Sequence, residues 1–236
     1  MKGKLYLIPI TLGECNPADV LPHTINRAID QIDHYIVENE KTARRFIKSI
    51  NPTKPQSSLH LSTLNKHTEI ADHTSMIQPC IDGINVGLMS EAGCPGVADP
   101  GAAIVKIAHE KGIQVVPLVG PSSILLAIMA SGMNGQSFAF NGYLPIDKND
   151  KKVAIKNFEK ISFDKNQSQL FIETPYRNNK FIEDLLQTLQ PNTHLCIAAD
   201  ITLDTEYIKT MRVAEWKKEK IDLQNRPAIY IIHKMY

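Results

Sequence analysis

The first half of the chain alternates short β-rich runs with longer stretches of helical character. Hydrophobic spacing predicts strands at residues 5–8, 35–37, 58–61, 85–89 and 114–116. Helices are expected between them, at residues 19–33, 40–50, 66–77 and 101–111. Consecutive strands separated by helices are typical of parallel pairing, because a parallel connection needs a long crossover. This order predicts a mostly parallel sheet with helices on both faces.

The pattern changes after Pro117, where Gly120 and Pro121 interrupt the chain. A helix is expected at residues 122–131, and further strands at residues 137–140, 169–172, 195–198, 207–212 and 228–232. Several of these strands are separated by short links, which predicts a mixed sheet with antiparallel pairs. We therefore expect an α/β protein of two domains, residues 1–118 and 119–236. The active-site cleft is expected between them, because ligands prefer domain interfaces.

Composition excludes several classes of protein. Hydrophobic residues make up 43% and charged residues 22%, as in ordinary globular proteins. The apolar runs are shorter than the roughly 18 residues of a membrane span, so no membrane partner is expected. The formal net charge is only +1, so any nucleic acid must bind through a local patch. The four cysteines are scattered, which argues against a disulfide framework and fits a reducing cytoplasm.

Two other features of the sequence suggest ligands but have simpler interpretations. His60, His67 and His73 have none of the spacings of common metal sites, so no metal is expected. Trp216 stands next to Lys217 and Lys218, a combination that can stack on and grip RNA. The commoner alternative is a solvated helix end with one anchoring aromatic residue, and this interpretation is favoured.

The most informative segment is the loop at residues 90–101, which reads S-E-A-G-C-P-G-V-A-D-P-G. It follows a predicted buried strand and precedes a helix. Its three glycines let a ligand approach the main chain, and its two prolines fix the path of the loop. Open α/β sheets bind ligands at the carboxyl ends of their strands. A structural turn remains the alternative on composition alone.

Two later segments repeat this arrangement of a strand, a turn and a helix start. Residues 116–123 read V-P-L-V-G-P-S-S, and residues 171–177 read F-I-E-T-P-Y-R. Free N–H groups at a helix start can bind polar ligand groups, although an ordinary helix cap is the alternative. No G-x-G-x-x-G or G-x-x-x-x-G-K-[ST] motif is present, which disfavours a dehydrogenase or a nucleotide-hydrolysing enzyme.

In this order the three segments resemble the tetrapyrrole methylase superfamily, and within it the ribosomal RNA small subunit methyltransferase I group. That group shows S-D-A-G-x-P-x-x-S-D-P-G, V-P-x-P-G-P-S-A and F-x-E-S-P-x-R. Residues 138–145, F-A-F-N-G-Y-L-P, also look like its F-x-F-x-G-F-L-P. The resemblance implies an S-adenosyl-L-methionine-dependent methyltransferase and a homodimer. By this resemblance, the following residues are expected to bind the methyl donor: Pro9, Glu91, Ala92, Gly93, Cys94, Pro95, Asp99, Pro121, Ser122, Ser123, Glu173, Thr174 and Pro175.

The sequence departs from this group where the methyl acceptor is expected to bind. The group's T-P-I-G-N-L is replaced by I-P-I-T-L-G at residues 8–13. Its E-D-T-R is echoed only by E-N-E-K-T at residues 38–42, and its H-x-H-N-E by L-N-K-H-T-E at residues 64–69. The donor assignment is therefore firmer than the substrate assignment.

Catalysis in this group would need alignment of a nucleophile behind the donor methyl carbon. A ribose 2'-hydroxyl is a weak nucleophile that a base or cation would assist, and Glu38, Arg45 and Glu91 are the candidates. We expect methylation of ribosomal RNA, with the small ribosomal subunit as a possible partner. Two alternatives stay open: a small acceptor such as a tetrapyrrole, or a binding protein that has lost catalysis.

Two helices are expected to provide contact surfaces. Lys41, Arg44, Arg45 and Lys48 follow three- and four-residue steps, so they share one helical face that could contact RNA phosphates. A solvated basic face is the alternative. The helix at residues 122–131 carries five large apolar residues, more than one buried stripe requires. Most of them are expected in the core, and some of them in a dimer interface.

Overall fold

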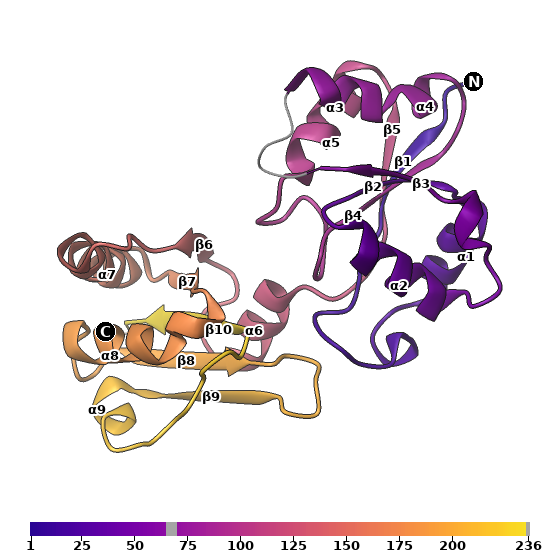
Figure 1. The fold of residues 1–236 in the computed structure, drawn as a ribbon. Coiled ribbons are helices and arrows are strands. Elements are labelled where there is room, and N and C mark those ends of the chain that lie inside the picture. The colour runs from indigo at the N-terminus through magenta and orange to yellow at the C-terminus, as the bar shows by residue number, and fades with distance from the viewer. Residues whose placement is uncertain (65–69, 235–236) are drawn as a thin grey trace. The chain divides into compact units, whose positions relative to one another are not determined.

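The computed structural model describes residues 1–64 and 70–234. The chain folds into two compact units, Met1–Ser122 and Ser123–Tyr236, each with a sheet of its own (Figure 1). The α/β class, with a parallel first sheet and a mixed second sheet, is confirmed. The domain boundary between residues 118 and 119, and a cleft between the domains, stay predictions.

The sheet of the first unit has five parallel strands in the order β3-β2-β4-β1-β5. The strands are β1 (Lys4–Leu7), β2 (His34–Val37), β3 (His60–Thr63), β4 (Val86–Met89) and β5 (Gln114–Pro117). The helices are α1 (His23–Gln31), α2 (Glu40–Ile50), α3 (Ile70–Met76), α4 (Gln78–Ile81) and α5 (Gly101–Glu110), with 3-10 turns at Pro17–Asp19 and Gln56–Ser58. Because all strands run the same way, their carboxyl ends meet at one edge.

Alternate residues of each strand pack into two different cores, one on each face of this sheet. Tyr35 and Val37 of β2 pack with α1 and α2, where Ile29 and Phe46 are buried. Ile36 packs on the opposite face in the core that Ile104 of α5 shares. Figure 1 shows α1 and α2 on one side of the sheet and α3, α4 and α5 on the other. Burial on both faces explains the nearly continuous apolar runs of these strands.

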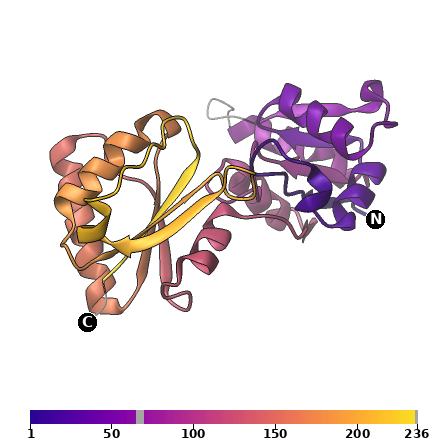
Figure 2. The same ribbon diagram turned by 90° about the horizontal axis from the view of Figure 1, so that it is seen from below.

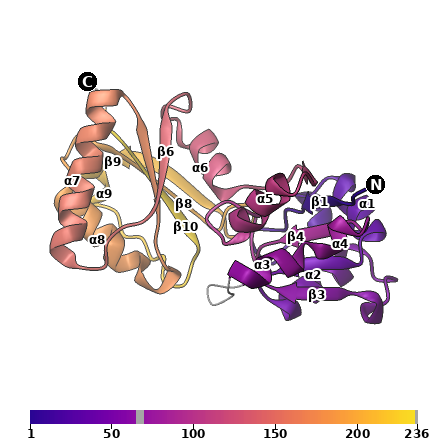
Figure 3. The ribbon, with the colours of Figure 1, turned by 90° about the horizontal axis from the view of Figure 1, so that it is seen from above.

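The sheet of the second unit has the order β6-β7-β10-β8-β9, in which only β6 and β7 pair in parallel. The strands are β6 (Phe138–Tyr143), β7 (Ser168–Ile172), β8 (His194–Ala199), β9 (Tyr207–Arg212) and β10 (Ala228–His233). The helices are α6 (Ser123–Ser131), α7 (Lys148–Lys165), α8 (Asn178–Thr188) and α9 (Val213–Trp216), with a 3-10 turn at Pro175–Arg177. The helices α7 and α8 cover one face, and α6 packs on the other (Figure 3).

Several predicted elements differ from the structure. The helix predicted at residues 19–33 begins only at His23, because the extended backbone at Pro22 (φ −75°, ψ 156°) is not helical. The strand predicted from residue 58 begins at His60, after the 3-10 turn. The first residues of the helix predicted at 66–77 lie outside the described residues. The 18-residue helix α7 was not predicted at all, which is the largest error.

Candidate functional site

The segments that follow β1, β4 and β5 converge, because these strands are neighbours in the first sheet. The main-chain N–H of Ile10, after β1, donates to the carbonyl of Gly93, after β4, at 3.0 Å. The thiol of Cys94 donates to the carbonyl of Pro121, after β5, at 3.3 Å. The structure thus brings together Pro9, residues 91–95 and Pro121, which the sequence places more than 20 residues apart.

Glycine is required where these loops touch. A Cβ atom on Gly120 would lie 2.2 Å from the Cβ of Pro9, so any side chain there would collide with the β1 loop. Gly93 has φ +69°, a left-handed conformation that other residues rarely adopt. A Cβ on Gly93 would lie 3.0 Å from Leu12 and 3.3 Å from the carbonyl oxygen of Pro121. Sequence reasoning identified Gly93 from its motif but missed Ile10, whose contribution is a main-chain hydrogen bond.

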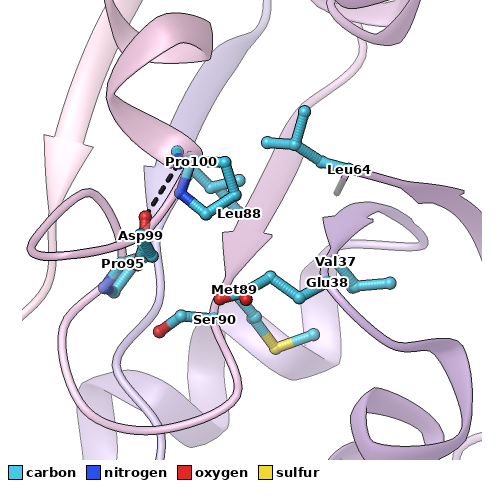
Figure 4. A pocket seen from close by; sticks show the side chains of 10 residues that line it. Val37, Glu38, Leu64, Leu88, Met89, Ser90, Pro95, Asp99 and Pro100 are labelled. Carbon is cyan, nitrogen blue, oxygen red and sulfur yellow. Dashed lines mark hydrogen bonds between the residues drawn. The ribbon is translucent and has the colours of Figure 1, made fainter. Parts of the chain in front are cut away.

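The carboxylate of Asp99 holds the loop after β4 in shape. Its two oxygens accept the N–H of Gly96 at 2.8 and 2.9 Å. Its Oδ1 also accepts the N–H of Gly101 at 2.8 Å (Figure 4). Gly101 is the first residue of α5, so Asp99 also satisfies a free N–H of that helix start. Asp99 therefore fixes the shape of the loop, and its part in donor binding stays a prediction.

Glu38 lies where β2 ends and reaches toward the loop after β4. Its Oε1 accepts the main-chain N–H of Glu91 at 3.3 Å, and Glu91 in turn accepts the hydroxyl of Thr42 at 3.5 Å. Burial raises the pKa of Glu38, and the neighbouring carboxylates of Asp99 and Glu91 raise it further. The result is a carboxyl group that holds its proton more firmly than an exposed glutamate.

A small hollow lies beside these carboxyl groups, too narrow between its lining atoms to hold a water molecule. Its lining comes from the ends of β2, β3 and β4 and from the loop after β4 (Figure 4). The lining includes Glu38, Leu64, Ser90, Pro95 and Asp99. Leu64 is 1% exposed and was not identified from the sequence, because a single leucine after a strand carries no motif.

Arg45, the third catalytic candidate, is placed differently from Glu38 and Glu91. It lies on α2, is exposed, and forms a 3.4 Å ion pair with Glu14. It does not line the hollow at the end of β2. The structure therefore places Glu38 beside Glu91, which, like Arg45, is exposed and does not line the hollow.

Glu173, Thr174 and Pro175 follow β7 in the second unit. Glu173 is 7% exposed, and its Oε1 accepts the N–H of Thr174 at 2.7 Å and the Thr174 hydroxyl at 3.1 Å. Arg177 lies 4.0 Å from the same oxygen. Pro175 opens a 3-10 turn that leads into α8. Ser122 and Ser123 stand at the junction of the two units, where Ser123 begins α6. The part of these residues in donor binding stays a prediction.

The other suspected ligand features have structural explanations. Trp216 is 1% exposed, and its indole N–H donates to the carbonyl of Leu195 at 2.8 Å, so it cannot stack on RNA. His67 lies outside the described residues. Among residues 1–64 and 70–234, no three histidine, cysteine or acidic side chains are grouped as metal ligands. No helix in the described part of the chain is long and apolar enough to cross a membrane.

The sequence profile of the family "Tetrapyrrole (Corrin/Porphyrin) Methylases" matches residues 16–217. A "Ribosomal RNA small subunit methyltransferase I" of Vibrio cholerae is 26% identical over 97% of this chain and 76% of the relative. The protein of that name from Buchnera aphidicola is 28% identical over 98% of this chain and 78% of its own length. These relatives align with both units of the chain.

Solved structures show the same fold. The methyltransferase CobJ superposes with a TM-score of 0.65 at 15% identity, over 98% of this chain and 94% of that protein. A uroporphyrin-III C-methyl transferase from Thermus thermophilus, complexed with S-adenyl homocysteine, gives a TM-score of 0.60 at 16% identity, over 98% of both chains.

Proposed function

The chain belongs to the tetrapyrrole methylase family of S-adenosylmethionine-dependent methyltransferases, and we propose that its substrate is RNA of the small ribosomal subunit. One observation carries this proposal. Relatives named for small-subunit ribosomal RNA methylation align along 97–98% of the chain. The tetrapyrrole-methylating neighbours are only 15–18% identical, so their likeness supports the fold alone.

The converging loops of the first unit fit the methyl donor. S-adenosylmethionine supplies an activated methyl group on a sulfonium cation, together with polar adenosine and amino-acid groups. Left-handed backbone at Gly93, Gly96 and Ala98 turns the loop after β4 sharply beside the segments after β1 and β5. The carboxyl groups of Glu38 and Glu91 lie at the same edge of the sheet and favour a cationic ligand. We therefore propose donor binding by the segments after β1, β4 and β5.

A ribose 2'-hydroxyl is the proposed acceptor, and it must lose its proton during methyl transfer. Of the three candidates, Glu38 is best suited to accept it, because burial raises its pKa toward the operating pH. Replacing Glu38 by glutamine should lower kcat by about 100-fold or more, the range of general base catalysis. Unchanged kcat would remove Glu38 from this role and leave Glu91 as the nearest alternative.

The basic face of α2 is proposed to contact RNA, with one change from the sequence-based prediction. Lys41, Arg45 and Lys48 are exposed. Arg44 is half-buried, donates to the carbonyl of Gln56 at 2.8 Å and lies 3.9 Å from Glu40. Lys41 and Lys48 are therefore available, Arg45 is exposed but paired with Glu14, and Arg44 holds the segment after α2.

We also propose a cytoplasmic homodimer. Of the five large apolar residues of α6, most of which were expected in the core, Ile128 alone is buried, whereas Ile124 and Leu126 are half-buried. Leu125 and Met129 are 58% and 78% exposed, one turn apart on the same face. A second subunit could cover them. A monomer in sedimentation at micromolar concentration would contradict the dimer.

The substrate is tested by methyl transfer from labelled donor to small ribosomal subunits. Subunits are prepared from cells that contain the protein and from cells that lack it. We expect label to enter RNA of the second preparation only, at a ribose position mapped by mass spectrometry. Label in neither preparation would contradict the proposal, and label in an added tetrapyrrole instead would favour a small-molecule acceptor.

A further inference from the structure

A row of lysines follows one face of α7 in the second unit. Lys148, Lys152, Lys156 and Lys160 recur every four residues and are all exposed. Residues four apart lie on one helical face, about 6 Å apart along the axis. The row is therefore a regular line of positive charge about 18 Å long.

Two hollows lie along this face, beside α8 and the segment after it. The first has a volume of about 360 Å³ and includes Lys148, Lys152 and Gln187 in its lining. The second has a volume of about 520 Å³ and includes Lys156, Lys160 and Lys234. Thr188 lines both, so the two hollows are neighbours, and together they are here called the α7 groove. Figure 2 shows α7 and α8 side by side, as their contacts require.

The acidic residues of the α7 groove are already engaged within the protein. Asp184 forms a 3.2 Å ion pair with the buried Lys151. Glu159 is 5% exposed and accepts the main-chain N–H of Gln190 at 2.8 Å as well as the hydroxyl of Thr193. These carboxylates are engaged by other groups of the protein and do not pair with the lysines of the row.

Three of the exposed lysines form no ion pair within the part of the chain that the structure describes. Among residues 1–64 and 70–234, no carboxylate forms an ion pair with Lys148, Lys152 or Lys156, whereas Lys160 pairs with Asp164 one turn away. Lysines spaced along one helical face repel each other. The whole chain has 26 basic and 25 acidic residues, so this concentration of charge is a local feature and not a property of the composition.

We propose that the α7 groove binds the sugar-phosphate backbone of RNA. This inference rests on the proposed RNA substrate and adds a binding surface remote in sequence from the donor loops. Lysine is a compact point charge that binds phosphates without reading sequence. The amide of Gln187 and the hydroxyl of Thr188 offer hydrogen bonds to phosphate and ribose oxygens.

The lining favours RNA over an acidic protein. The core of a protein interface is typically rich in aromatic residues, methionine and arginine and poor in lysine. In the α7 groove the one aromatic lining residue is Phe163, and Lys234 lies over its ring at 5.5 Å. The groove therefore offers no uncovered ring for stacking on an RNA base or for packing against an apolar side chain of a protein. Its lysines suit contacts to the sugar-phosphate backbone of RNA.

The test uses the full chain and a short labelled single-stranded RNA of mixed sequence. Changing Lys152 and Lys156 together to glutamate should lower affinity about 10-fold or more, and changing both to glutamine should lower it less. Each lost phosphate contact should flatten the plot of log affinity against log salt by about 0.7. The matched control changes Lys217 and Lys218 to glutamate, exposed lysines of the same unit that lie outside the groove.

Three results would overturn the inference. They are absence of RNA binding by the parent protein at low salt, equal effects of the groove and control variants, and competition by polyglutamate as effective as that by RNA of equal charge. The last would indicate an acidic protein partner. Unchanged thermal unfolding and unchanged donor affinity establish that the glutamate variant is folded.

A methyl-transfer assay separates this inference from the proposed function. With small ribosomal subunits as substrate, the groove variant should raise KM and leave kcat unchanged, because uniform binding is lost. If ribosomal RNA is not methylated but the groove variant still loses RNA affinity, the groove stands and the proposed substrate falls. If methylation proceeds with the same KM in groove and control variants, the groove falls alone.

Discussion

The two units use their sheets in different ways. In the first unit five parallel strands end at one edge, and the segments after β1, β4 and β5 join there through main-chain contacts. In the second unit the strands pair mostly in antiparallel fashion, so the carboxyl ends of β9 and β10 point the opposite way from those of β7 and β8. The row of exposed lysines in this unit lies on a helical face instead. In the proposed roles, the parallel sheet brings several loops together at one edge for a small ligand, and the helical face provides an extended surface for a polymer.

The strongest test of this contrast is a bulky residue at Gly93. The change Gly93→Leu forces a side chain into left-handed backbone at about 1–2 kcal/mol and against Leu12 and Pro121. We expect donor affinity to fall about 100-fold, equivalent to roughly 3 kcal/mol. Titration calorimetry with S-adenosylmethionine measures it.

Gly132 provides the matched control in the second unit. It has a similar φ of +70°, but nothing lies within 4 Å of an added Cβ. The change Gly132→Leu should introduce the same backbone strain and leave the affinity for S-adenosylmethionine unchanged. If both variants lose the donor equally, the loss reflects general destabilisation, and the assignment of the donor loops to the first unit is wrong.

A smaller effect is expected when Asp99 becomes asparagine. Both oxygens of Asp99 accept main-chain N–H groups, so an amide nitrogen in one position would face the N–H of Gly96. Hydrogen bonds to charged groups contribute about 1.5–3 kcal/mol. We expect a loss of unfolding free energy of about 1–2 kcal/mol and donor affinity reduced roughly 10-fold.

Asp147 is the comparison residue for this change. It caps α7 with Oδ1 alone, which accepts the N–H groups of Asn149 and Asp150. Asparagine caps helices about as well as aspartate. Asp147→Asn should therefore leave stability and donor binding close to the parent values. Urea unfolding measures the stability of both variants. If Asp99→Asn and Asp147→Asn lost the same unfolding free energy, Asp99 would have no special part in the loop.

The sequence predicted the first unit better than the second for a physical reason. The bounds of α2 were predicted correctly, because its buried residues Ala43, Phe46 and Ile47 form a clear apolar stripe. In α7 the buried positions include Lys151, Glu159 and Ser162. Their polar groups are satisfied by residues far along the chain, such as Asp184 and Gln190, so the helix carries no apolar stripe that spacing alone would detect.

The donor loops were predictable only in part. Gly93 and Asp99 belong to a motif that can be recognised within one segment. The contact of Gly120 with Pro9 joins segments more than 100 residues apart and depends on the strand order. The raised pKa of Glu38 likewise depends on burial and on Asp99 and Glu91, which lie more than 50 residues away. Such properties come from topology, which local spacing does not contain.

The basic face of α2 tests whether RNA contacts are confined to the second unit. Changing Lys41, Arg45 and Lys48 together to glutamine should lower RNA affinity several-fold. It should also flatten the salt dependence by about 2, near 0.7 for each phosphate contact. Arg44 is left unchanged because its guanidinium group donates a hydrogen bond to the main-chain carbonyl of Gln56. Fluorescence anisotropy at several salt concentrations measures both quantities.

The control removes Lys106 and Lys111, exposed cations at α5 and its end. If the α2 variant behaves like this control while the α7 groove variant loses affinity, RNA binding belongs to the second unit. Similar losses in the α2 and α7 groove variants would instead extend the RNA surface over both units.

The smallest expected effect concerns the charge on Glu38. Its pKa is raised by burial and then by Asp99 and Glu91, so the folded protein disfavours the ionised form. Stability from this carboxyl is therefore complete below its ordinary pKa, about 4.3, and is lost as pH rises through the raised value. A glutamine keeps an oxygen to accept the N–H of Glu91 and carries no charge. The Glu38→Gln variant should unfold at a slightly higher urea concentration than the parent near neutral pH, and this difference should disappear on acidification.

The change Glu206→Gln gives the baseline. Glu206 also accepts a main-chain N–H, from Thr202, but it lies on the exposed surface of the second unit. If the difference in unfolding midpoint were independent of pH, or became larger in acid, the pKa of Glu38 would not be raised in the folded protein.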